Sequence, residues 1–369
     1  MKRSILMNIK ICSVSIISVL AIGCATVPQR EFKSYSDAFE ETKNVTERLL
    51  LEYDAAKRSE EKLKAEKTPV HISNSPYPPS VTITFESING SSTDYVGARR
   101  EALEVLSSFN TVLMSLAEGK KPEEIKSSVE SLIGGLQNVA SLVGANLPIP
   151  YAGEIGSLIS TVVAKLQEAK NRQQFVDALR EAEPIIRGIL LLFAKDAEDI
   201  YRIRAIQADR LWSGHQDAVA TFVRQMRAVA EEHAHPAGNQ EERLAKIEKD
   251  TRQVLDRAGL EKNSEKLPTS GTRPFDALTL SQLEQTLVQA EGEADKYQAV
   301  IRAQNALLEL VVSYGRLLSK TNDALTIVRA AIDDPPDIRQ QALEFVSFAF
   351  AVKRDWEALD AARRAAATE

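Results

Sequence analysis

The residues best suited to metal chemistry lie together at His233 and His235, directly after Glu231 and Glu232. Imidazole nitrogens and carboxylate oxygens are both common zinc ligands, so this run could bind a divalent metal. A zinc site needs a third protein ligand, and neither that ligand nor the motif H-E-x-x-H can be identified in the sequence. The run is also typical of a solvated helix end, where protonated histidines stabilise the helix dipole. We therefore predict no metal and no cofactor.

Patterns for covalent catalysis are equally weak. Ser59 and Lys62 match the motif S-x-x-K, but they lie in a strongly charged helical stretch that cannot desolvate the lysine. The sequence contains no G-x-S-x-G, no P-loop and no dinucleotide-binding fingerprint. The chain is therefore predicted not to be an enzyme.

The start of the chain carries the pattern of an export signal. Three basic residues, Lys2, Arg3 and Lys10, come before an apolar run over 11–23 that ends at Cys24. The segment Leu20-Ala21-Ile22-Gly23-Cys24 resembles the lipobox of bacterial lipoproteins. That resemblance implies cleavage between Gly23 and Cys24, a diacylglycerol thioether on Cys24, and acylation, for example with palmitate, of its new amine. Several acyl chains together hold a protein firmly on a membrane.

The same resemblance implies a location in the cell. Ala25 follows the lipidated cysteine where an aspartate would retain the protein in the inner membrane. The expected place is therefore the outer membrane of the cell envelope, facing the periplasm. An alternative is an uncleaved signal-anchor helix, because no charged residue occurs between Ile11 and Arg30. Pro28 and Gln29 end the apolar part of that stretch early.

Composition limits the possible partners. Cys12 and Cys24 are the only cysteines, so the mature chain would have no thiol available for a disulfide. The formal net charge is −6 and no basic block is present, which argues against nucleic acid as a partner. The expected partners are membrane lipid, through Cys24, and a protein partner or a second copy of the chain, through helical surfaces.

Periodicity after the signal predicts mostly long helices, interrupted once by a proline-rich segment. Within that segment, residues 80–85 alternate apolar with polar and could pair with 70–72 as a small β-hairpin. The predicted organisation is a signal peptide at 1–23, an anchor and membrane-proximal helix at 24–67, the proline-rich segment with the β-hairpin at 68–92, a helical bundle at 93–235, a polar linker with a short helix at 236–278, and two helices at 279–366.

The stretch beginning at residue 279 holds the longest regular pattern. Apolar residues follow two core phases of a heptad repeat: Tyr297, Val311, Leu318, Leu325 and Ile332 on one, and Val300, Leu307, Tyr314 and Val328 on the other. Only Gln304 and Thr321 interrupt them, which indicates a long helix packed in coiled-coil fashion. The predicted fold is mainly α: an elongated bundle of long helices with coiled-coil-like packing and a small β-hairpin insertion.

Residues 131–166 form a nearly uncharged helical hairpin with a proline turn. Its apolar and turn positions are Leu136, Val139, Val143, Leu147, Pro148, Pro150, Ile155, Ile159 and Val162. Burial inside the bundle would explain the missing charge and is the interpretation that we favour. Alternatively the hairpin inserts into a bilayer, as the heads of α-helical pore-forming toxins do, although each arm is shorter than the ~20 apolar residues that a span requires.

These observations predict a lipid-anchored cell-envelope protein that acts as a binding or scaffolding module and carries out no catalysis. The anchor, the long helices and the missing catalytic motifs are the basis for that prediction. The alternative function is a membrane-active effector that inserts the hairpin at 131–166.

Overall fold

A computed structural model describes residues 29–65, 95–143, 152–260, 266–333 and 339–368. Eight helices and no strand occur in these ranges, which confirms a mainly α-helical bundle. The helices are α1 (Gln29–Ala65), α2 (Tyr95–Ala117), α3 (Pro122–Val143), α4 (Ala152–Glu168), α5 (Arg172–Glu231), α6 (Asn239–Arg257), α7 (Ala277–Asp333) and α8 (Arg339–Thr368). The predicted signal peptide at 1–23, Cys24, and the proline-rich segment at 68–92 with its predicted β-hairpin lie outside the described residues.

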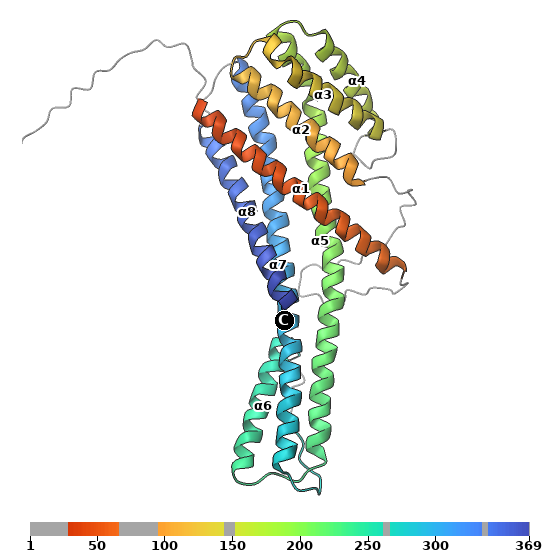
Figure 1. The fold of residues 1–369 in the computed structure, drawn as a ribbon, viewed down its shortest axis with the longest axis vertical. Helices are drawn as coiled ribbons and strands as arrows, with labels where there is room; N and C mark the ends of the chain where they lie inside the picture. The colour runs from red at the N-terminus through yellow and green to blue at the C-terminus, as the bar shows by residue number, and fades with distance from the viewer. Residues whose placement is uncertain (1–28, 66–94, 144–151, 261–265, 334–338, 369) are drawn as a thin grey trace, which may run out of the picture.

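Helices α5 and α7 form the axis of the molecule. They contain 60 and 57 residues, which correspond to about 90 and 85 Å at the ~1.5 Å rise of an α-helix. They run antiparallel, because Tyr201 of α5 pairs with Gln304 of α7 while the later His215 pairs with the earlier Glu293. Figure 1 shows α1 to α4 and α8 gathered around one half of this axis and α6 alone beside the other half. We call these halves the head and the stem.

The head and the stem have separate hydrophobic cores. The head core takes side chains from α1 to α4, the first half of α5, the second half of α7, and α8. The stem core takes side chains from the second half of α5, from α6 and from the first half of α7. The segment 236–278 therefore contributes α6 to a packed three-helix stem. Burial of these apolar stripes stabilises both halves of the elongated bundle.

The heptad pattern of α7 faces helices of the same chain. α7 packs against α5 along the axis and against α8 in the head. Five of its predicted core positions are buried: Tyr297, Leu307, Tyr314, Leu318 and Leu325. The two polar interruptions are buried as well, and the hydroxyl of Thr321 donates to the carbonyl oxygen of Leu317 at 2.9 Å. The coiled-coil-like pattern is thus used within one chain.

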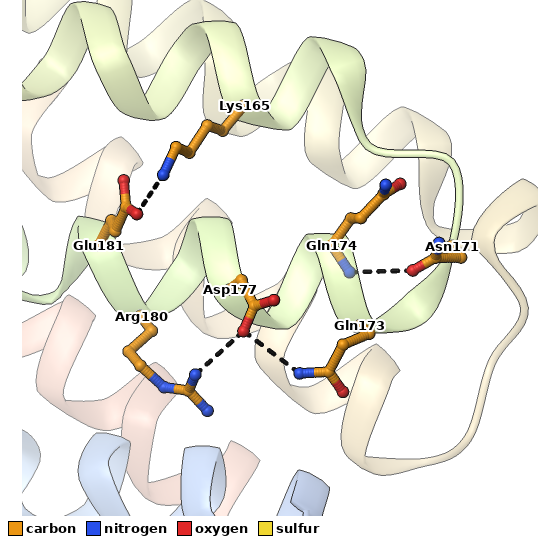
Figure 2. Close-up of polar contacts among 7 residues, drawn as sticks. All are labelled: Lys165, Asn171, Gln173, Gln174, Asp177, Arg180 and Glu181. Carbon is orange, nitrogen blue, oxygen red and sulfur yellow. Dashed lines mark hydrogen bonds and ion pairs between the residues drawn. The ribbon is translucent and has the colours of Figure 1, made fainter.

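A turn with well-defined polar contacts joins α4 to α5 (Figure 2). The side chain of Asn171 accepts a hydrogen bond from the backbone N–H of Gln174 at 3.0 Å and so caps the start of α5. Lys165 of α4 forms an ion pair with Glu181 of α5, one turn beyond Asp177, which accepts from Arg180 at 3.0 Å. The cap marks the start of the long helix, and the charged pairs lie at its surface.

Two neighbouring glycines of α3 yield a matched test of the packing between α2 and α3. An added Cβ on Gly135 would lie 3.0 Å from a methyl carbon of the buried Val105, whereas one on Gly134 would meet nothing within 4 Å. We expect Gly134→Ala to raise the free energy of unfolding by roughly 0.5–1 kcal/mol, because alanine favours the helix. Gly135→Ala should lower it, because the stiff valine has to move. Urea unfolding of both variants measures the difference, and equal effects would contradict the close packing.

Candidate functional site

The most unusual feature of the described residues is a layer of polar side chains inside the head core. It contains Thr46 and Tyr53 of α1, Arg99 of α2, Asp196 of α5 and Tyr314 of α7, and we call these five residues the polar layer. All five are buried among the apolar side chains of the head. Helix α1 crosses the other helices of the head obliquely (Figure 1) and lies over the polar layer, which it contacts through Thr46 and Tyr53.

The centre of the polar layer is a buried ion pair. Arg99 donates two hydrogen bonds to the carboxylate of Asp196, from Nε to Oδ2 at 2.5 Å and from Nη2 to Oδ1 at 2.7 Å. The side chains are only 2% and 5% exposed. Burial raises the pKa of Asp196 even though Arg99 acts in the opposite direction. Removing this pair from water is therefore costly, and the geometry must be kept to offset that cost.

Helix α1 closes the polar layer with one aromatic and one hydroxyl contact. The ring of Tyr53 lies under the guanidinium of Arg99, 4.9 Å from ring centroid to Cζ, as a cation–π contact. Thr46 donates to the carbonyl oxygen of Thr42 at 2.8 Å, so its 2.9 Å contact with Tyr314 has the tyrosine hydroxyl as donor. Burial raises the pKa of Tyr314, which keeps this hydroxyl protonated.

A second set of charges fastens α1 near the surface. Glu52 of α1 accepts from Arg204 of α5 at 2.8 Å and from Arg363 of α8 at 3.0 and 2.9 Å. We call these three residues the surface clamp. Burial by itself would raise the pKa of Glu52, but the hydrogen bonds and positive charges of the two arginines outweigh it and hold the pKa below its ordinary value. The clamp joins α1, α5 and α8 through one carboxylate.

The lowered pKa of Glu52 makes the clamp sensitive to acid. A carboxyl group whose pKa is lower in the folded state contributes stability that is present above its unfolded-state pKa and is lost as pH falls through its folded-state pKa. We expect the free energy of unfolding to fall more steeply below about pH 4.5 in the wild type than in Glu52→Gln. Urea unfolding between pH 3 and 7 measures both slopes; identical slopes would contradict the assignment.

Chemically, the polar layer and the surface clamp can fasten helices. Their charged groups face one another, and the central pair is closed to solvent. Within the described ranges, no group of three or more His, Cys, Asp or Glu side chains could hold a metal ion. Both features hold α1 on the bundle, the polar layer through Tyr53 and Thr46 and the clamp through Glu52.

The two histidines singled out in the sequence lie at the free end of the stem, in the connection from α5 to α6, where they contact the segment that leads into α7. Nδ1 of His233 donates to the carbonyl oxygen of Val229 at 2.7 Å, and its ring packs edge-on against Phe275. Nδ1 of His235 contacts the hydroxyl of Thr269 at 3.1 Å. The segment that leads into α7 approaches so closely that a Cβ on Gly271 would overlap the Glu232 backbone.

The hairpin at 131–166 corresponds to α3 and α4. Its described stripe residues face the head core: Leu136, Val139, Ile159 and Val162 are all at most 2% exposed. The side chains of Val143, Leu147, Pro148, Pro150 and Ile155 lie outside the described residues. In the described part of the chain, no helix combines the length and the apolarity that a membrane crossing needs.

The remaining candidate residues, or their side chains, lie outside the described part of the structure. Gly23 and Cys24 precede the first described residue, and the side chains of Ser59 and Lys62 are not described although both residues lie in α1. The polar layer and the surface clamp, in contrast, were not anticipated. The sequence does contain a hint of the buried ion pair, because each of its charged residues interrupts an apolar stripe. Asp196 lies within the buried stripe of α5 that contains Phe193, Ala197 and Ile200. Arg99 lies within the buried stripe of α2 that contains Ala98 and Ala102.

Comparison with known proteins yields no relative. No family model, no curated protein and no solved structure matches this chain.

Proposed function

We propose that this chain is a lipid-anchored protein of the bacterial cell envelope that works as a non-catalytic binding or scaffolding module. The observation that carries the proposal is the fastening of α1. This helix follows the lipobox-like segment almost directly, and its buried face contacts α2, α5, α7 and α8. A helix held by four others transmits the position of an anchor to the whole bundle.

The elongated shape of the bundle is suited to a spacer between the membrane and a partner. The start of α1 lies in the head, and the stem extends away from it along α5 and α7 (Figure 1). If Cys24 is attached to lipid, the head lies near the membrane and the free end of the stem points away from it. The axis helices, about 85–90 Å long by their ~1.5 Å rise per residue, then set the reach of the protein from the membrane. A partner would bind the helical surfaces presented along this length.

The anchor is tested by the intact mass of protein purified from the envelope of its native host. We expect wild-type protein to lack residues 1–23 and to carry lipid mass on Cys24. Cys24→Ser should keep the signal and lack the lipid. Wild-type protein that retains the signal and carries no lipid would overturn the anchoring half of the proposal.

The binding role is tested by photo-crosslinking in intact cells. A crosslinking residue at exposed Gln253 of α6 probes the stem, and one at exposed Gln173 of α5 probes the far end of the head as a matched control. We expect mass spectrometry to identify one specific adduct, either with an envelope protein or with a second copy, from one of the two positions. Crosslinks to abundant proteins only, the same from both positions, would contradict a scaffolding role.

A further inference from the structure

We propose that the packing of α1 on the bundle is energetically coupled, through the polar layer, to the packing of α2 and of α3, which lies against α2. In this role we call α1 a clasp. This inference is independent of lipidation and goes beyond the proposed function. Helix α1 then has a conformational role in addition to connecting the bundle to the proposed lipid anchor.

The coupling follows from where the ion pair lies. Arg99 and Asp196 join α2 to α5, but their protection from water depends on α1, because Tyr53 lies against the guanidinium. If α1 lifts, water reaches the pair. The attraction between the two charges then weakens about fourfold as the effective dielectric constant rises from about 20 to about 80. Loss of α1 therefore loosens the hold of α5 on α2.

The second contact makes the coupling extend to the axis of the molecule. Thr46 accepts from Tyr314 of α7, and this tyrosine has its hydroxyl buried in the same layer. Lifting α1 would leave that donor without its acceptor, which opposes partial release. Two of the contacts of α1, one to α2 and one to α7, thus lie in the polar layer, and lifting α1 as a unit breaks both.

The two arms of the hairpin are held by different helices. α3 packs on α2, and α4 packs on α3 and α5. The Lys165–Glu181 pair between α4 and α5 adds little to this packing, because its side chains are 49% and 38% exposed. Once α2 is loosened, the apolar stripe of α3 therefore becomes the next surface to open, while α4 keeps its packing on α5.

A buried ion pair is a poor source of net stability, since apolar replacements of similar volume are often at least as stable. Its value lies in excluding intermediate arrangements, because each arrangement that separates the two charges leaves one of them buried alone. The polar layer thus favours two states, with α1 and α2 both seated or both released. This two-state property is what an experiment can detect.

Hydrogen exchange of the full chain, followed by mass spectrometry, tests the clasp. Tyr53→Leu keeps apolar bulk on α1 and removes the ring under Arg99, and Phe39→Leu makes a matched change on the same buried face of α1. We expect Tyr53→Leu to speed exchange in α2 and α3 at least tenfold and to leave α6 unchanged. Phe39→Leu should change α2 far less. Equal effects of the two substitutions would overturn the proposal.

A second arm asks whether the coupling runs through the ion pair. In an Arg99→Met/Asp196→Leu background, Tyr53→Leu should no longer speed exchange in α2, and an undiminished effect would overturn the inference. Wild-type exchange at low urea supplies a measurement that needs no variant. Coupled seating requires amides of α1 and α2 to share one opening free energy and one urea dependence, and two distinct dependences would overturn it.

Discussion

Replacing Asp196 with alanine lowers the free energy of unfolding by about 3–5 kcal/mol, the usual cost of removing one partner of a buried ion pair. The substitution leaves the guanidinium of Arg99 in a place that is 2% exposed, without the carboxylate that receives two of its hydrogen bonds. Urea unfolding followed by circular dichroism measures the loss.

Two controls separate this effect from a general loss of side-chain contacts. Asp177→Ala on the same helix removes an aspartate that is 52% exposed and paired with Arg180, and it should cost less than about 1 kcal/mol. The double variant Arg99→Met/Asp196→Leu removes both charges and should recover most of the lost stability. A double variant that is no more stable than Asp196→Ala would show that the loss does not come from an unpaired charge.

Leu136→Ala is the second substitution with a large expected effect, about 2–5 kcal/mol of unfolding free energy. Leu136 is fully buried between α3 and the rest of the head core, so the truncation removes apolar contacts and leaves a cavity. The neighbouring Gln137 is exposed, and Gln137→Ala should change stability by less than about 0.5 kcal/mol. Urea unfolding of the two variants is again the measurement.

This result also bears on the alternative function of the hairpin. If the stripe stabilises the folded bundle, Leu136→Ala lowers stability, and the wild type should release no dye from liposomes even at high protein concentration. Dye release by the wild type that Val143→Asp abolishes would instead favour membrane insertion by the hairpin at 131–166. A stability unchanged by Leu136→Ala would contradict the packing of α3 in the head.

The sequence by itself determined the features that depend on neighbours along the chain. The apolar spacing of 131–166 predicted two helices that each carry an apolar stripe, and the described stripe residues of α3 and α4 are buried. The polar segment at 236–278 was predicted to hold a short helix, which is α6. Helical periodicity is a local property, so it can be recognised without knowledge of the packing partner.

Only the tertiary structure decided which of these helices meet, and with what polar contacts. Gln304 and Thr321 were recognised as interruptions of a heptad, yet α5 and α8 as the partners of α7 could not be read from the pattern. The polar layer joins residues 97 and 268 positions apart, and the surface clamp joins residues 152 and 311 positions apart. Charged side chains look alike along a sequence whether they face water or one another; burial, which depends on all the helices together, separates the two cases.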